Sequence, residues 1–193
     1  MFRKILAAML VGVLALSLAG CANKFRVERE GMPEGLKTKL EEQIKTGQEM
    51  LDAAKDDSAK ATALLEIAFA NQQLGYLDKA IPVYKQILDL YPQHFQSLNN
   101  LGVIYEEVGE HLTAAKYYGQ LLEANPSNTE ALSDAIRELI AAEHFDDAQT
   151  NLENFARYNK DSMQSLQTFV SEQFESIRQA RLKSQSQQNA NAK

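Results

Sequence analysis

The side chains that most often do chemistry in proteins are thinly spread in this sequence of 193 residues. Its three histidines, His94, His111 and His144, each fall in a predicted turn between helices. A metal shared by His111 and His144 is conceivable, because they occupy similar turns of neighbouring segments, but solvent-facing rings explain them better. Acidic pairs such as Glu41-Glu42 and Glu106-Glu107 fit a solvated helix surface better than a catalytic dyad. The sequence also lacks a phosphate loop, an HExxH motif, a cysteine pair and a nucleophile elbow, so we expect no enzyme, no metal and no cofactor.

Cys21 is the residue with the clearest chemical role. It ends the segment Leu18–Cys21, which reads Leu-Ala-Gly-Cys, and it follows an uncharged, mostly apolar run of 14 residues, Ile5–Leu18. That run is shorter than the roughly 20 residues of a spanning helix and, behind Arg3 and Lys4, is typical of a signal-peptide core. The small residues before the cysteine let an extended chain enter a peptidase, and the thiolate is the nucleophile that accepts an acyl group.

The segment 18–21 resembles the lipobox of bacterial lipoproteins. The resemblance implies that residues 1–20 are a signal peptide and that acylated Cys21 anchors the chain to a membrane of the bacterial cell envelope. Because Ala22 follows the cysteine in place of Asp, it implies the periplasmic face of the outer membrane if the envelope is Gram-negative. The alternative is a plain secretory leader, or an inner-membrane anchor, in which the cysteine is incidental.

Composition places the rest of the chain among helical, soluble domains. Hydrophobic residues make up 45% and charged residues 24%, glycine and proline are scarce, and helix-forming residues dominate, which predicts an all-α fold. The formal net charge is −6. Because an acidic chain repels phosphate backbones, we expect no nucleic acid among the partners.

The flanks of the domain are predicted from polarity and periodicity. Residues 21–35 are polar and contain glycine and proline, which predicts a lipidated, flexible tether. One apolar stripe predicts an N-terminal helix over 36–56, and another predicts a capping helix over 161–183. Residues 184–193 are rich in Ser, Gln and Asn, which predicts a disordered tail.

The centre of the chain repeats itself with a period of 34 residues. The identical residues at this spacing are Leu64, Leu98 and Leu132; Gly75 and Gly109; Ala80, Ala114 and Ala148; Tyr84 and Tyr118; Leu88 and Leu122; and Pro92 and Pro126. Each unit carries two helical stripes separated by a turn. A period in this range is the signature of a helical repeat array.

These residues resemble the tetratricopeptide repeat (TPR) pattern, most closely at Leu101-Gly102, Tyr105, Gly109, Ala114 and Pro126. The resemblance implies a right-handed α-solenoid of helix-turn-helix repeats with flanking capping helices. It places repeat 1 at 61–94, repeat 2 at 95–128 and a degenerate repeat 3 at 129–160. In repeat 3, Glu143 replaces the turn glycine. Small residues such as Gly102 and Ala114 are expected where paired helices cross, and Tyr118 is expected to fill the adjoining space.

The resemblance also implies a groove, lined by the first helix of each repeat, that takes a partner polypeptide. The candidate groove residues are Leu65, Phe69, Gln72, Gln73, Asn99, Val103, Glu106, Glu107, Ser133 and Arg137. Leu65 and Phe69 share one helix face and form the best candidate anchor, and Asn99 is placed to bond a main chain. Equally, Leu65 and Phe69 could pack against the N-terminal helix, which would then fill the groove.

The sequence therefore predicts a lipid-anchored adaptor or scaffold that binds an envelope protein or peptide, for example in assembling a pilus, secretion or cell-wall machine. Two alternatives stay open. One is a structural lipoprotein that self-associates into a homo-oligomer through Leu65 and Phe69. The other is a regulatory subunit of an envelope enzyme that binds a small ligand in the groove.

Overall fold

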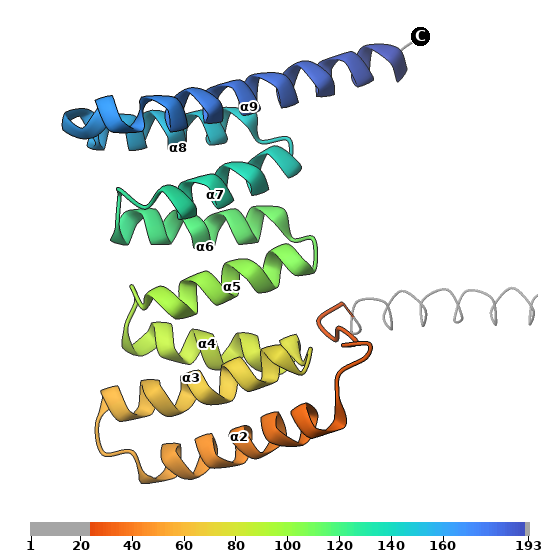
Figure 1. Cartoon of the computed structure of the whole chain (residues 1–193), viewed down its shortest axis with the longest axis vertical. Helices are drawn as coiled ribbons and strands as arrows, with labels where there is room; N and C mark the ends of the chain where they lie inside the picture. Colours follow the sequence, from red (N-terminus) through yellow and green to blue (C-terminus); the bar gives the residue numbers. More distant parts are fainter. Residues whose placement is uncertain (1–23, 192–193) are drawn as a thin grey trace, which may run out of the picture. The chain divides into compact units, whose positions relative to one another are not determined.

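In the computed structural model, residues 24–191 are described (Figure 1). The predicted signal peptide and the predicted acylation site, Cys21, lie outside this range. The regular structure of the described residues is helical, apart from one isolated β-bridge between Arg26 and Tyr76. The all-α class predicted from the sequence is confirmed. The chain divides into two compact units, the first ending at Leu90 and the second beginning at Tyr91.

The first unit contains α2 (Glu34–Ala53), α3 (Asp57–Gln73) and α4 (Leu77–Leu90). Asp56 caps α3, because its side chain accepts a hydrogen bond of 2.8 Å from the backbone N–H of Ala59. Gly75, with a φ of +76°, follows the end of α3 and lets the chain reverse into α4. The two helices predicted for repeat 1 are therefore α3 and α4.

Helix α2 packs on α3 through a close approach at Gly47. A Cβ atom there would lie 2.7 Å from the side chain of Ile67 and 3.3 Å from the carbonyl oxygen of Ala63. Leu40, about two helical turns toward the N-terminus from Gly47, packs with Ala70 in a small apolar cluster. The glycine thus lets the two helix backbones come closer than a larger residue would allow.

The N-terminal segment 25–29, called the strap below, is bound to the α3–α4 turn. The backbone N–H of Val27 donates to the carbonyl of Gly75 at 3.0 Å, and that of Asp78 donates to the carbonyl of Phe25 at 3.0 Å. The prediction of a flexible tether over 21–35 is therefore wrong for the strap. Its polar composition concealed the pairing, because the bonds are made by main-chain atoms, which every residue type supplies.

The second unit is a succession of helices joined by short turns (Figure 1). They are α5 (Phe95–Glu107), α6 (His111–Ala124), α7 (Thr129–Ala141), α8 (Phe145–Tyr158), the short 3-10 helix η1 (Lys160–Ser162) and α9 (Met163–Asn191). Each α-helix packs against the next. Side-chain caps begin α5 at His94 and α7 at Asn128.

The paired helices of repeat 2 meet at Gly102, as the sequence predicts. A Cβ atom at this position would lie 2.6 Å from the ring of Tyr118, whose side chain is buried. Ala114, also fully buried, is the small residue on the opposing helix. The glycine leaves the space that the tyrosine ring occupies against α5, which a Cβ atom would fill.

The turn between the two helices of each repeat keeps the same backbone conformation. Gly109 has a φ of +72° between α5 and α6, close to that of Gly75 in the first unit. Glu143 has a φ of +60° between α7 and α8, and among the described residues it is the one non-glycine with positive φ. Repeat 3 has lost the turn glycine but kept the turn.

Helix α9 covers the end of the second unit and extends further than expected. The prediction ended it at residue 183 with a disordered tail, whereas the helix continues to Asn191. Its buried residues, Val170, Ile177 and Ser184, recur every seventh position, so one stripe runs onto the neighbouring helices. The hydroxyl of Ser184 donates to the Glu143 carboxylate at 3.1 Å. A polar contact thus takes the third position of a stripe whose first two positions are apolar.

Candidate functional site

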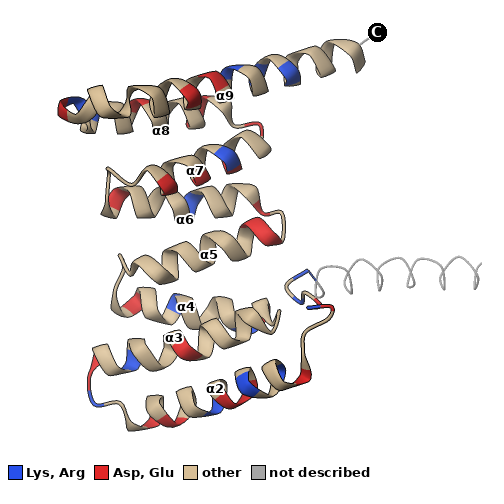
Figure 2. Ribbon diagram, viewed as in Figure 1, with Lys and Arg blue, Asp and Glu red and all other residues tan. Residues whose placement is uncertain are grey.

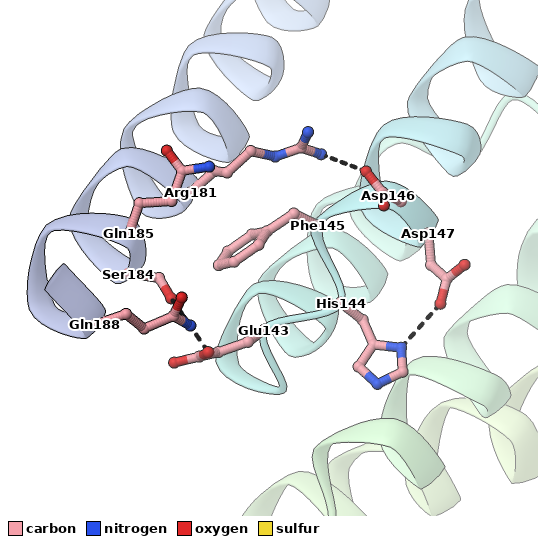
Figure 3. Close-up of a pocket in the computed structure, with 9 residues that line it drawn as sticks. All are labelled: Glu143, His144, Phe145, Asp146, Asp147, Arg181, Ser184, Gln185 and Gln188. Carbon is pink, nitrogen blue, oxygen red and sulfur yellow. Dashed lines mark hydrogen bonds and ion pairs between the residues drawn. The ribbon is translucent and has the colours of Figure 1, made fainter. Parts of the chain in front are cut away.

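A polar hollow of about 530 Å³ lies between the α7–α8 turn and α9 (Figure 3). Its charged side chains are already engaged, because Arg181 pairs with Asp146 at 2.7 Å and His144 with Asp147 at 2.9 Å. The Phe145 ring lies beneath Arg181. Over the described part of the chain, no group of three or more His, Cys, Asp or Glu side chains is placed to hold a metal. We find no catalytic arrangement in this hollow.

The candidate groove residues of the first unit lie on α3 with unequal exposure. Phe69 is 43% exposed, Leu65 is partly buried and Gln73 is exposed. Gln72 is buried and turns toward α4, where its side-chain oxygen accepts a 2.7 Å hydrogen bond from the Tyr84 hydroxyl. The prediction that Gln72 faces a partner is therefore wrong, because its amide satisfies the phenol inside the helix pair.

Helix α2 leaves Phe69 accessible. Its contacts on α3 are with a different face, which carries Ala63, Ile67 and Ala70. The alternative in which the N-terminal helix fills the groove thus does not describe Phe69.

In the second unit, Val103 on α5 stands at the position that Phe69 holds in the preceding repeat, and it is 38% exposed. Asn99, one turn earlier, is partly buried, and Glu107 is exposed. Charge on α5 is entirely acidic, and Arg137 is the one basic residue of α7 (Figure 2). This face of the second unit is therefore an apolar side chain bordered by carboxylates.

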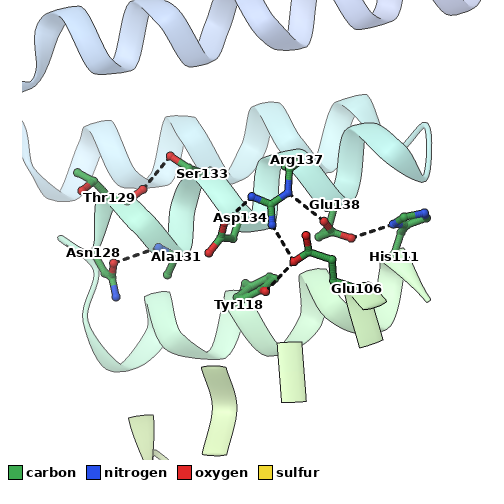
Figure 4. A network of polar contacts seen from close by, with 10 residues as sticks. All are labelled: Glu106, His111, Tyr118, Asn128, Thr129, Ala131, Ser133, Asp134, Arg137 and Glu138. Atoms are coloured by element: carbon green, nitrogen blue, oxygen red, sulfur yellow. Dashed lines mark hydrogen bonds and ion pairs between the residues drawn. The ribbon is translucent and has the colours of Figure 1, made fainter. Parts of the chain in front are cut away.

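Arg137 and Glu106 belong to a polar network that joins α5, α6 and α7 (Figure 4). The Glu106 carboxylate accepts a hydrogen bond from the Tyr118 hydroxyl at 3.0 Å and one from Arg137 Nη2 at 2.8 Å. Arg137 Nη1 also donates to Asp134 at 2.6 Å. The guanidinium is thus held by carboxylates from two helices.

Glu138 is the buried member of this network. Its side chain is only 3% exposed, and its two oxygens lie 3.2 Å from Arg137 Nε and 2.8 Å from His111 Nδ1. The histidine expected in a solvent-facing turn is therefore a partner of a buried carboxylate. One carboxylate oxygen of Glu138 contacts the Arg137 guanidinium and the other contacts the His111 ring. Both oxygens therefore have partners, and a buried carboxylate without partners would be costly.

The network also favours one protonation state for two of its members. Burial and, after it, the hydrogen bond to Glu106 raise the pKa of Tyr118 well above its ordinary value. Burial opposes the charge on Arg137, but hydrogen bonding to Asp134 and the nearby carboxylates raise its pKa overall. Near neutral pH, Tyr118 therefore stays a donor and Arg137 stays a cation.

Sequence reasoning singled out Glu106 and Arg137 as groove residues and considered His111 as a solvent-facing ring or a metal ligand, but it did not identify Glu138 as their buried partner. Ser133, predicted to face the groove, bonds back to the Thr129 carbonyl of its own helix at 3.0 Å. A signal for Glu138 was present in the repeat alignment, because the two preceding repeats have Ala70 and Ile104 at its position. A charged residue at a repeat position that is otherwise apolar indicates a buried side chain with a charged or polar partner.

Comparison with known proteins agrees with the repeats seen in the structure. The family described as tetratricopeptide repeat matches residues 59–127. Protein adenylyltransferase Fic of Culex quinquefasciatus is 32% identical over 94 residues, which are 48% of this chain but 19% of that enzyme. Photosystem I assembly protein Ycf3 of Cyanophora paradoxa is 30% identical over 118 residues, covering 54% of this chain and 68% of the relative. The chain thus spans about a fifth of the Fic protein.

Among solved structures, a MamA protein (RS-1 ArsTM double mutant) superimposes with a TM-score of 0.52, covering 76% of this chain and 88% of that one. At 16% sequence identity, this likeness concerns the fold alone. The 34-residue period, the helix pairs with their positive-φ turns and the small residues at the helix crossings all agree with these matches. The chain belongs to the tetratricopeptide repeat family.

Proposed function

We propose that this protein is a non-catalytic scaffold of the bacterial cell envelope, anchored by an acylated Cys21, which binds a partner polypeptide on its first-helix faces. The proposed binding faces are that of α3 around Phe69 and that of α5 and α7 around Val103. In a Gram-negative cell, the proposed location is the periplasmic face of the outer membrane. No helix within residues 24–191 has the length and apolar character needed to cross a bilayer, so the proposed attachment rests on the lipid.

The observation that carries this proposal is the exposure of Phe69 and Val103 at the same position of successive repeats. Both are large apolar side chains on helices whose other apolar residues are mostly buried. Covering an exposed phenylalanine on a partner stabilises a complex by about 1–2 kcal/mol. Exposed apolar side chains at the same position of two successive repeats favour a binding face more than a singly exposed residue does.

Charge indicates the chemistry of the partner at the second unit. Arg137 is engaged by Glu106, Asp134 and Glu138, so three carboxylates share one cation. The exposed Glu107 adds to this excess of negative charge next to Val103. A partner segment that combines apolar and basic side chains complements this face best.

The relatives support a scaffold more than an enzyme. The match to the adenylyltransferase covers 19% of that enzyme, and the match to a protein named for photosystem I assembly covers 68% of that relative. We therefore propose an assembly role for this chain with a partner of its own.

Site-specific photocrosslinking in cells tests the binding faces. A photoreactive amino acid replaces Phe69 or Val103, and the matched control replaces Leu112, which is 49% exposed on α6. We expect positions 69 and 103 to give adducts of the same mass and position 112 to give none. Absence of adducts at both positions, or equal adducts at all three, contradicts the proposal. An adduct of twice the chain mass establishes the self-associating alternative.

The anchor is tested separately. The parent chain, grown with labelled palmitate, is expected to carry the label and to fractionate with membranes. In Cys21→Ser both properties should be lost. A membrane-bound, unlabelled parent would mean that the anchor is not an acyl chain on Cys21.

A further inference from the structure

The strap has a consequence for how the first unit meets a membrane. Phe25, Arg26 and Val27 pair with the α3–α4 turn through the two backbone hydrogen bonds described above and the bridge between Arg26 and Tyr76. The side chain of Arg26 adds an ion pair of 3.1 Å with Asp78 and lies 4.3 Å from the centre of the Tyr76 ring. The strap is therefore held at one place on the unit by main-chain and side-chain contacts together.

A second attachment lies next along the chain. Arg29 Nη2 donates to the carbonyl oxygen of Gln72 at 3.3 Å, at the end of α3. Gly75 has no side chain, and this permits the close approach, because a Cβ atom there would lie 1.9 Å from the carbonyl oxygen of Val27. The strap and the turn glycine fit each other.

We infer that the end of the first unit formed by the strap and the α3–α4 turn is its membrane-facing surface, apposed to the lipid headgroups. This inference rests on the proposed acylation of Cys21. An extended chain advances at most about 3.6 Å per residue, so the step from Cys21 to the fixed Phe25 spans no more than about 14 Å. Without the strap, the free chain from Cys21 to the first residue of α2, Glu34, would reach about 47 Å. The strap thus shortens the free chain between Cys21 and the folded unit about threefold. It also determines which end of the unit is joined to the proposed anchor.

Charge at this end is compatible with headgroups but does not dominate. The cations within the strap, its flanks and the turn are Lys24, Arg26, Arg29, Lys37 and Lys79; the acids are Glu28, Glu30, Glu34 and Asp78. A hollow of about 530 Å³, lined in part by Arg26, Arg29 and Lys37, opens here. Because positive and negative charges nearly balance here, the short connection to Cys21, more than attraction to anionic lipid, sets the orientation of the first unit on the membrane.

Fluorescence quenching measures the orientation directly. The full-length acylated chain is reconstituted in vesicles that contain a headgroup nitroxide lipid, with a fluorophore on one introduced cysteine. The two matched positions are Lys79→Cys, in the first turn of α4, and Lys55→Cys, between α2 and α3. The 17 residues of α3 separate the two ends of the unit by about 25 Å. We expect quenching at position 79 to be at least about twofold greater than at position 55.

Releasing the strap should abolish that difference. Gly75→Ala brings a Cβ atom against Val27, whereas the control Gly109→Ala has nearly the same φ, +72°, and nothing within 4 Å of the added atom. Both variants carry similar backbone strain, and only the first displaces the strap. If Gly75→Ala does not fold, Arg26→Glu, which breaks the ion pair with Asp78 at the surface, replaces it.

The outcomes separate this inference from the proposed function. Mass spectrometry of the N-terminal peptide first establishes acylation of Cys21, and its absence refutes the anchor itself. With acylation present, equal quenching at the two positions of the parent overturns the orientation. A difference that survives both Gly75→Ala and Arg26→Glu overturns the role of the strap.

Discussion

Glu143 occupies a backbone conformation that the other two repeats give to glycine. Its φ of +60° is strained for a residue with a side chain, and this strain costs roughly 1 kcal/mol. The carboxylate recovers part of the cost by accepting the hydroxyl of Ser184. The side chain therefore has a contact function that a glycine would not have.

We predict that Glu143→Gly raises the free energy of unfolding by about 0.5–1 kcal/mol, because relief of backbone strain outweighs one partly exposed hydrogen bond. Urea denaturation followed by circular dichroism measures the change. Gly109→Ala, which introduces the strain without any contact, should shift the midpoint the opposite way. A lower midpoint for Glu143→Gly would show that the link to α9 is the larger effect.

His94 caps α5 with a ring nitrogen, which accepts the backbone N–H of Ser97 at 3.3 Å. Burial lowers the pKa of His94 below its ordinary value of 6.5. The folded state therefore prefers the neutral ring, while the unfolded chain takes up a proton near pH 6.5. The contribution of this cap is present above the unfolded pKa and is lost as the pH falls below it.

We predict that His94→Asn, which keeps a capping oxygen but does not titrate, weakens the fall in melting temperature between pH 7.5 and pH 5.5 (about one unit on either side of the ordinary histidine value). The other two histidines stay in place as an internal reference. Identical pH profiles for the parent and His94→Asn would exclude the cap as a source of acid sensitivity.

At the scale of the helices, the polar network shows how a repeat position changes use. In repeat 1 the tyrosine hydroxyl of the second helix bonds to the neutral Gln72, and in repeat 2 it bonds to the charged Glu106. In repeat 3, Ile140 and Leu152 stand at the corresponding positions. The tyrosine at this repeat position thus takes a neutral partner in repeat 1 and a charged partner in repeat 2, whereas in repeat 3 apolar residues occupy both positions.

We predict that Arg137→Ala lowers the free energy of unfolding by about 1–2 kcal/mol. The value is below that for a fully buried pair, because the Arg137 side chain is 50% exposed. The triple variant Glu106→Gln, Arg137→Val, Glu138→Ile takes at each position a residue found in an earlier repeat, and it should regain the parent's stability. Chemical denaturation of the two variants checks both values. A triple variant less stable than Arg137→Ala would mean that the ionic network cannot be exchanged for the packing of its neighbours.

At the scale of the whole chain, the features that were predictable are those that recur. The repeat helices follow from apolar residues at a 34-residue period, and the turn of repeat 2 follows from Gly109. Residues that occur once left weaker signals. The orientation of Gln72 depends on a hydroxyl twelve residues away, and the burial of Glu138 depends on Arg137 and His111 together. Such partners are specified by the packed helices and not by local propensity.

The ends of the chain were the least predictable parts. The strap pairs through main-chain groups, which leave no residue pattern, and through side-chain contacts of Arg26 and Arg29 with residues far along the sequence. Helix α9 continues beyond its apolar stripe, and there Ser184 bonds to Glu143. On the proposed binding faces, the exposure of Phe69 and Val103 could be predicted from the repeat alignment, because each lies next to a position that packs inside the helix pair. The alignment did not predict which of their neighbours turn inward.

The strap can pair only at a late stage in the folding of the first unit. Arg26 and its partner Asp78 are 52 residues apart, and the strap precedes its partner turn in synthesis. Pairing must wait until that turn has emerged and closed. The strap is therefore unpaired while the first repeat is incomplete, and the acylation that we propose at Cys21 can take place in this interval. The order of the chain thus allows the proposed acylation to precede docking of the strap.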